Sequence, residues 1–271
     1  MAEKEDYLDT QNFWGDHRLI PYEVFKRGTQ MKCIYCGDFA DTREHCPSRT
    51  FLQEPRPCDL PVLPTCKKCN NSFSADELYM KTFIEHMKAA WLGDKADVKD
   101  KLKKNLEVIK AQEKVNEILK TGKIEFDNKI GHVLEKLAKC HCVYELTENY
   151  YRHEWELKDI SYTFRSCVEE NVWDSIGRVE CIADCILPEI GSRCFRNIRV
   201  LEVVMENIEN YNRETRQQLI LVWNIVQEGN YEYVAYLNRH REMIVKIIIM
   251  DFLYAEIIYA RCRNNDLKMN F

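Results

Sequence analysis

The sequence lacks a long uninterrupted hydrophobic run and an excess of positive charge. Its most apolar stretch, residues 244–260, is interrupted by Lys246, Asp251 and Glu256, and each charge at the centre of a bilayer would cost roughly 3 kcal/mol. The stretch therefore predicts buried strands rather than a membrane helix. The formal net charge is -5, which excludes a globally basic surface. Any contact with nucleic acid must come from a local basic patch.

The sequence also lacks the start of a secretory protein. Residues 1–30 contain no apolar core followed by a small-residue cleavage site. Without a secretory context, disulfides are the weaker explanation for the thirteen cysteines of the chain. Metal ligation by some cysteines, with the others buried as free thiols, is the stronger one. We therefore expect a cytoplasmic protein that binds a metal.

Residues 31–75 differ in composition from the rest of the chain. They contain six of the thirteen cysteines and five of the seven prolines, with few apolar residues at regular spacing. A segment of this kind cannot build a hydrophobic core of its own. A bound metal is therefore the expected organiser of this region.

Two CxxC pairs provide the ligands for such a metal. Cys33 and Cys36 form the first pair, and Cys66 and Cys69 form the second. Four thiolates at this spacing suit a closed tetrahedral Zn²⁺ site, and Gly37 permits a tight turn after the first pair. The alternative is four unrelated buried thiols in a cysteine-rich chain. We predict a structural zinc.

The residues between and after the pairs make the pattern more specific. Glu44 and His45 follow the first pair, and Asn70 directly follows the second. This segment, about residues 31–77, resembles the HNH nuclease family, in which zinc knuckles often brace a ββα-metal fold. The positions that carry the resemblance are Cys33, Cys36, Glu44, His45, Pro47, Cys66, Cys69 and Asn70.

The resemblance implies a catalytic arrangement. His45 would act as general base and take the proton from an attacking water, a task that suits a group with a pKa of about 6.5. Glu44 and Asn70 would supply oxygen ligands to a single Mg²⁺ or Mn²⁺ ion. In the ββα-metal fold a hairpin carries the acid–histidine pair, and the following helix carries the asparagine. The implied catalytic residues are therefore His45, Glu44 and Asn70.

Two positions depart from the family pattern. Many relatives have another histidine or lysine four positions after the asparagine, where this chain has Ser74. Ser74 and Glu77 together are typical of a capping box, which predicts that Ser74 caps the next helix. Asp76 or Glu77 would then be the candidates to replace the missing ligand. Pro61 stands near the position where many relatives have an asparagine that steadies the loop.

Basic residues cluster around the candidate site. We expect them to contact phosphates, because such contacts position a nucleic acid and supply affinity. The predicted contacts are Arg43, Arg49, Lys67 and Lys68, with Arg56 close by in sequence. The lysines over residues 99–120 alternate with acidic residues and favour a solvated helix face held by ion pairs.

Hydrophobic spacing predicts helices followed by antiparallel strands. The expected helices are residues 74–92, 97–120 and 128–143. The expected strands are residues 161–165, 219–226, 231–237, 244–250 and 252–259, with a hairpin turn at residues 228–230.

The predicted fold class is α+β. A zinc-braced ββα-metal (HNH) module is followed by helices and a C-terminal antiparallel β meander. We expect two domains. Residues 1–95 form the nuclease module with its N-terminal extension, and residues 96–271 form an accessory domain for target or partner recognition.

These features predict a metal-dependent HNH endonuclease that hydrolyses phosphodiester bonds in DNA, in a restriction or phage-defence setting and under the control of a partner protein. The residues do not separate DNA from RNA as substrate. One alternative is a non-catalytic zinc module that binds nucleic acid or protein, which Ser74 and the acidic net charge favour. A second alternative is a helical regulatory or assembly protein whose zinc is only structural.

Overall fold

The computed structural model describes residues 32–58, 60–94, 96, 100–181, 185–186, 188, 192–207 and 212–262. The predicted N-terminal extension, residues 1–30, lies outside this part of the chain. The helices are α2 (Lys67–Ser72), α3 (Ser74–Leu92), α4 (Leu106–Thr121), α5 (Asn128–Glu145), α6 (Thr147–Arg152), α7 (Glu170–Asp174) and α8 (Arg193–Arg196). The strands are β1 (Thr42–His45), β2 (Val62–Thr65), β3 (Trp155–Phe164), β4 (Val179–Cys181), β5 (Cys185–Ile186), β6 (Ile198–Asn207), β7 (Asn212–Val222), β8 (Asn224–Gln227), β9 (Tyr231–Asn238), β10 (Met243–Ile249) and β11 (Leu253–Arg261).

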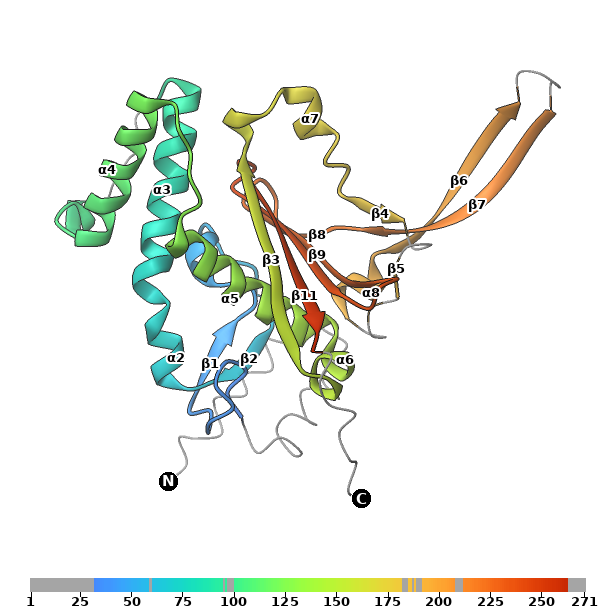
Figure 1. Ribbon diagram of the computed structural model, residues 1–271, viewed down its shortest axis with the longest axis horizontal. Coiled ribbons are helices and arrows are strands. Elements are labelled where there is room, and N and C mark those ends of the chain that lie inside the picture. The colour runs from blue at the N-terminus through green and yellow to red at the C-terminus, as the bar shows by residue number, and fades with distance from the viewer. Residues whose placement is uncertain are drawn as a thin grey trace.

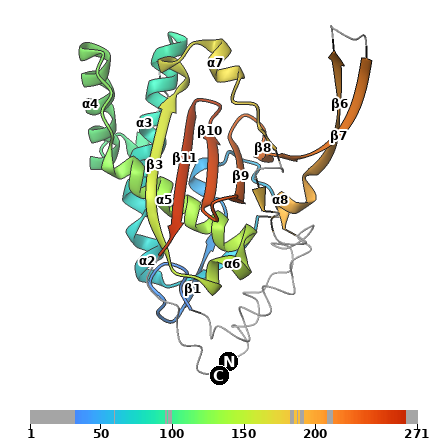
Figure 2. The same ribbon diagram turned by 45° about the vertical axis from the view of Figure 1, so that its right-hand side comes forward.

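A central antiparallel sheet organises the C-terminal half. Its strand order is β3-β11-β10-β9-β5, and β8 also pairs with β9. Figure 2 shows β3, β11, β10 and β9 side by side. The consecutive strands β8 to β11 form the predicted antiparallel meander. The chain is therefore an α+β protein with a C-terminal antiparallel sheet, as the hydrophobic spacing and the hairpin turn predicted.

The most apolar stretch of the sequence is two strands of this sheet. Residues 244–260 cover most of β10, the turn after it and most of β11, and Lys246 lies opposite Glu256 across the pair. The Lys246 ammonium also donates to both carboxylate oxygens of Glu180, at 2.8 and 2.9 Å. Asp251, in the turn, pairs with Arg165 and Arg178. The charges that interrupt the apolar run are thus all paired, which confirms buried strands in place of a membrane helix.

Helix α5 lies across one face of the sheet and contacts β3, β9, β10 and β11. Its apolar stripe is fully buried: Ile130, Val133, Leu134 and Leu137 each have 0% of their surface exposed. Helix α3 packs against both α4 and α5 (Figure 1). Helix α5 is therefore the element that joins the helical part of the molecule to the sheet.

The second predicted helix begins later than the sequence suggested. The expectation was residues 97–120, whereas α4 begins at Leu106, after the short 3-10 turn Asp100–Leu102. The side chain of Asn105 accepts a hydrogen bond from the backbone N–H of Glu107 and caps the helix. Asparagine favours this role because its side-chain oxygen satisfies an N–H that has no partner within the helix.

One hydrophobic core draws on both predicted domains. Its buried side chains include Phe51 and Phe83 from the first range, and Leu134, Tyr233 and Ile247 from the second. A separate smaller cluster joins the cysteine-rich region to α5. The division at residue 95 stays a prediction, but the packing crosses it extensively.

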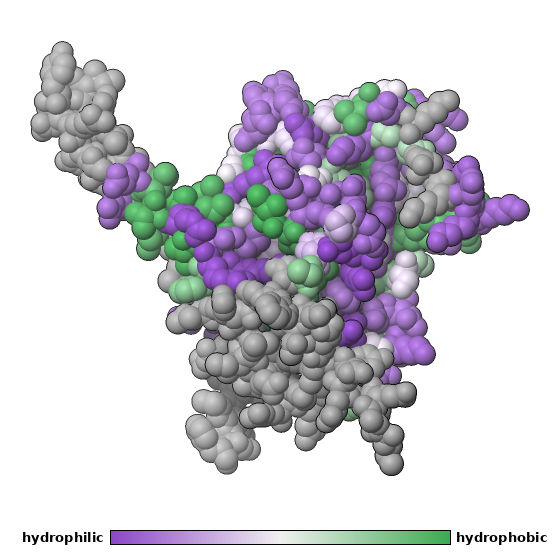
Figure 3. All heavy atoms as spheres, turned by 180° about the vertical axis from the view of Figure 1, so that it is seen from behind, coloured by the Kyte–Doolittle hydropathy of each residue, from purple (hydrophilic) through white to green (hydrophobic). Residues whose placement is uncertain are grey.

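Strands β6 and β7 form an arm that projects from the body, with β4 pairing at its base (Figure 1). The predicted strand over residues 219–226 is in fact divided between β7 and β8, because the chain breaks at the buried Trp223. Figure 3 shows hydrophobic residues gathered where the arm meets the body. Exposed apolar side chains in this region are Val200 and Leu201 on β6, Leu219 on β7 and Ile225 on β8.

Candidate metal centre and catalytic site

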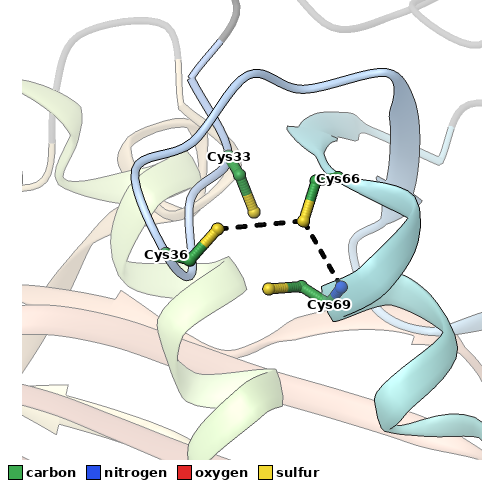
Figure 4. A group of neighbouring side chains, drawn as sticks. All are labelled: Cys33, Cys36, Cys66 and Cys69. Carbon is green, nitrogen blue, oxygen red and sulfur yellow. Dashed lines mark hydrogen bonds between the residues drawn. The ribbon is translucent and has the colours of Figure 1, made fainter.

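Four cysteines converge on one point between a turn and a helix (Figure 4). The sulfurs of Cys33, Cys36, Cys66 and Cys69 all lie within 4.8 Å of one another. The Cys36 and Cys66 sulfurs are 3.8 Å apart. Tetrahedral Zn²⁺ with ligand bonds of about 2.3 Å requires sulfur–sulfur edges of about 3.8 Å. The donor set and its dimensions therefore fit a structural zinc.

Local backbone structure holds each cysteine pair in place. In the first pair, the N–H of Gly37 donates to the Cys33 carbonyl at 2.9 Å, and Gly37 has a φ of 78°. A positive φ of this size favours glycine, as the sequence predicted. In the second pair, Cys66 is the N-cap of α2, and its sulfur accepts from the Cys69 N–H at 3.4 Å. Both pairs are thus shaped by the chain itself.

The Cys33 sulfur is prepared to bind a metal. Burial alone would raise the pKa of Cys33, but hydrogen bonds from the backbones of Cys66 and Cys36 overcome that effect and lower the pKa to about 6. Because the thiolate is the form that binds metal, this environment favours the ligating state at neutral pH.

The hairpin of β1 and β2 carries the acid–histidine pair, as the resemblance implied. Glu44 lies opposite Leu63, and His45 lies opposite Val62. Glu44 is 5% exposed, whereas Arg43 and His45 are half-buried. Successive side chains of a strand point to opposite faces. The Glu44 carboxylate and the His45 imidazole therefore leave different faces of β1.

The Glu44 carboxylate is paired with a lysine that the sequence analysis did not single out. The Lys136 ammonium on α5 donates to Oε1 of Glu44 at 2.9 Å and also binds Oε1 of Glu77. Thr50 donates to the other oxygen of Glu77 at 3.1 Å. Lys136 is only 3% exposed. The sequence did offer a signal for this buried pair: Lys136 stands beside Val133 and Leu137 on the apolar face of a predicted helix.

A divalent cation at this site would depend on the remaining oxygens. Oε2 of Glu44 is buried and has no hydrogen-bond partner. The Asn70 amide donates from Nδ2 to the Arg43 carbonyl at 3.3 Å, which fastens α2 to β1 and leaves Oδ1 as its other polar atom. These oxygens fit Mg²⁺ or Mn²⁺ in type. In the described residues no second group of three His, Cys, Asp or Glu ligands converges.

His45 lies in a positive environment. Burial lowers the pKa of His45 to about 4, and the nearby charges of Arg49, Arg43 and Arg56 add to the effect. The imidazole is therefore uncharged at neutral pH and can accept a proton, but it is a weaker base than a histidine with the usual pKa of about 6.5. The same arginines give the surroundings of His45 an electrostatic preference for an anion. Two of them, Arg43 and Arg49, are predicted phosphate contacts.

The other two predicted phosphate contacts lie on α2. Lys67 and Lys68 are exposed at the start of this helix, beside the second cysteine pair. The backbone N–H of Lys67 donates to the Asp41 carboxylate at 2.7 Å. This bond ties the beginning of α2 to the residue before β1, so both lysines are held close to the hairpin.

The capping-box prediction was wrong. The N-cap of α3 is Phe73, without a side-chain capping bond, and Ser74 is the first residue of the helix. Glu77 does not reach back to the helix start, because its carboxylate binds Lys136 and Thr50. Asp76 is also engaged elsewhere, at 2.8 Å from Nδ1 of His132. At Pro61 the carbonyl accepts from the Cys46 N–H at 2.8 Å, so the loop is tied there by backbone alone.

A buried polar network lies behind the hairpin. The sulfur of Cys46 is 3.4 Å from Nδ1 of His141, and Nε2 of His141 is 2.9 Å from the Tyr231 hydroxyl. The imidazole stacks on Tyr233, whose hydroxyl donates to Glu145 at 2.6 Å. Burial lowers the pKa of His141 to about 3. The network connects the residue after His45 to α5 and to β9, and no pattern in the sequence indicated it.

No protein-family model matches the chain, no curated protein matches its sequence, and no solved structure matches its fold. Among the described helices, none combines the length and the apolar character that a membrane-spanning segment requires. The geometry of the chain therefore defines its class: an α+β protein with a four-cysteine centre at a β-hairpin.

Proposed function

We propose that the chain is a metal-dependent endonuclease of the HNH (ββα-metal) type that hydrolyses phosphodiester bonds in DNA. The observation that carries the proposal is the uncharged imidazole of His45 among three arginines, on a hairpin braced by four cysteines. Phosphodiester hydrolysis requires a proton acceptor beside a group of cations. This combination supports cleavage more than binding alone.

Each residue has a defined task in this proposal. His45 takes the proton from the attacking water. Arg43 and Arg49 hold the phosphate beside it, and Lys67 and Lys68 extend the contact to neighbouring phosphates. Glu44 and Asn70 would hold the divalent cation, which would supply Lewis-acid stabilisation of the charge that develops on the phosphate. The zinc would hold the hairpin and α2 together and take no part in the chemistry.

Nicking of supercoiled plasmid in the presence of Mg²⁺ or Mn²⁺ tests the proposal. We expect the His45→Ala variant to lose about 10²- to 10⁴-fold in rate, because a general base contributes about that factor. The matched control is His240→Ala, which removes an exposed imidazole from the turn after β9. Nicking that persists at the wild-type rate in His45→Ala would disprove the assignment.

One observation favours a second candidate, a zinc module that binds nucleic acid or protein without cleaving. Lys136 already compensates the charge of Glu44, and Glu44 leaves β1 on a different face from His45. A bound divalent cation is therefore not needed to balance this carboxylate. Salt-dependent binding of DNA would favour this candidate if the protein does not nick plasmid. The absence of nicking must hold with Mg²⁺ and with Mn²⁺, and with any activating partner present.

A further inference from the structure

A basic pocket lies apart from the cysteine-rich region. It has a volume of about 370 Å³ and is formed by α8, the start of β6 and the start of β8. Within the described part of the chain, its lining contains three guanidinium groups and no carboxylate. The lining residues are Arg193, Arg196, Asn197, Arg199, Asn224, Ile225 and Val226. In a chain of net charge -5, such a concentration of positive charge marks a place that suits an anion.

Buried contacts fix the position of this pocket. The Cys194 N–H donates to the Glu145 carboxylate at 2.9 Å, and its sulfur accepts from the Asn224 amide at 2.9 Å. Cys194 is fully buried, so it anchors the short helix α8 on which Arg193 and Arg196 stand. Guanidinium groups on an anchored backbone lose less conformational freedom when they bind a ligand.

Two further contacts shape the wall of the pocket. Asn197 donates from its amide to the Asn224 side-chain oxygen at 2.7 Å. Nη1 of Arg199 donates to the carbonyls of Arg196 and Ile198, at 2.7 and 2.9 Å. The Arg199 guanidinium is therefore held against the end of α8, next to the other two arginines.

Strand β8 connects this pocket to the arginines around His45. Asn224, at its first position, lines the pocket, and Gln227, at its last, donates from its amide to the carbonyls of Gln53 and Pro55 at 2.9 and 3.3 Å. The next residue in the chain is Arg56, an electrostatic neighbour of His45. The three residue steps from Asn224 to Gln227 along β8 span about 10 Å. One strand of duplex DNA presents about three phosphates over the same length.

We propose that the pocket of Arg193, Arg196 and Arg199 is a phosphate-binding site that holds the backbone of a nucleic acid extending from His45 along β8. The ligand is a phosphodiester chain, which the pocket grips without reading bases. The choice of nucleic acid as the ligand rests on the proposed function. The existence of the pocket and its positive charge do not depend on the proposed function.

The test measures binding to a fluorescently labelled DNA duplex across a series of salt concentrations, in the His45→Ala background so that the DNA stays intact. The variant Arg193→Gln, Arg196→Gln, Arg199→Gln is expected to reduce the slope of log binding constant against log salt by about 2 to 3, because each phosphate that is no longer neutralised removes about 0.9 from the slope. Arg199→Gln alone, a change at an exposed side chain, is expected to reduce it by about 1.

The matched control removes the same charge elsewhere. Lys101→Gln, Lys104→Gln, Lys120→Gln changes three exposed lysines in and just before α4 and is expected to leave the slope within about 1 of the parent. Equal slopes for the two triple variants and the parent would overturn the proposal. So would an effect confined to titrations with inorganic phosphate or a mononucleotide, because the pocket would then be a small-anion site.

These outcomes are separable from the proposed function. A protein that does not nick plasmid but shows the expected change in slope keeps the phosphate-binding site and loses the nuclease assignment. A protein that nicks plasmid with an unchanged slope keeps the assignment and loses this site. Circular dichroism of each variant, compared with its parent, shows whether it is folded, and Arg199→Gln decides the matter if the triple variant is not.

Discussion

At the scale of single residues, Lys136 has the least expected environment in the molecule. It is almost entirely buried and lies between two carboxylates from different elements. Burial raises the pKa of Glu44, while the charge of Lys136 opposes that rise. A charge that is removed from water this completely must keep its partner, because an isolated buried carboxylate is costly.

Replacement of Lys136 by methionine, which preserves the length of the side chain, is expected to lower the free energy of unfolding by about 3–5 kcal/mol. The reason is the uncompensated charge left on Glu44 and Glu77. Urea unfolding measures the change. The control Lys139→Met removes a half-exposed lysine on the same helix, 4.0 Å from Glu135, and is expected to cost less than about 1 kcal/mol. Equal effects of the two changes would contradict this account.

His141 makes stability depend on pH in a defined direction. Its pKa is lowered to about 3 in the folded protein, against about 6.5 in the unfolded chain. As pH falls below about 6.5, the unfolded chain therefore gains a proton that the folded one does not. The imidazole contributes nothing to this dependence above that pH. It lowers stability as pH falls toward about 3, by about 1.4 kcal/mol for each pH unit.

The measurement is the free energy of unfolding of the wild type and of His141→Asn between neutral pH and the onset of zinc loss. The difference between the two proteins is expected to shift in favour of the variant as pH falls. His240→Asn, at an exposed turn, serves as the control and is expected to follow the wild type. A constant difference between wild type and His141→Asn would show that the imidazole does not titrate on unfolding.

At the scale of elements, the four-cysteine centre joins a turn, a hairpin and a short helix. The described part of α2 has no buried residue, and β1 and β2 have four residues each. These elements are too short to form a stable unit alone. Metal binding of order 10 kcal/mol is the expected source of their order.

Removal of the metal is therefore expected to unfold the hairpin and α2 while the sheet remains. One zinc per chain should be found by metal analysis, and Co²⁺ in its place should give the absorption of a tetrathiolate site. Cys66→Ser is expected to lose the metal, and Cys58→Ser, which changes an exposed cysteine outside the pairs, is expected to retain it. Full metal content in Cys66→Ser would refute the four-cysteine assignment.

The same elements show what the sequence could and could not predict. The two cysteine pairs and Gly37 were accessible, because short fixed spacings determine them, and the resemblance to the HNH family implied the hairpin position of Glu44. The ion-pair partner of Glu44 could not be predicted, because Lys136 lies 92 residues further along the chain. Helix α3 spans residues 74–92 as predicted, but its cap was assigned wrongly for a related reason: tertiary ion pairing of Glu77 outweighed the local capping preference.

At the scale of the whole molecule, the main core takes side chains from both sides of the predicted boundary at residue 95. Helix α3, from the first range, packs on α4 and α5 from the second. A fragment of residues 1–95 is therefore expected to bind zinc but to lack cooperative thermal unfolding, because α3 would expose its buried face. Calorimetry of the zinc-loaded fragment beside the full chain decides this, and a cooperative transition in the fragment would establish an independent domain.

Helix α5 provides Lys136 to the hairpin, and about one and a half to two and a half turns later it provides His141 and Glu145 to the tyrosines of β9. The hairpin and the sheet therefore both depend on side chains of α5. Transfer of the hairpin alone to another protein would leave the Glu44 carboxylate without the Lys136 ammonium that balances its charge.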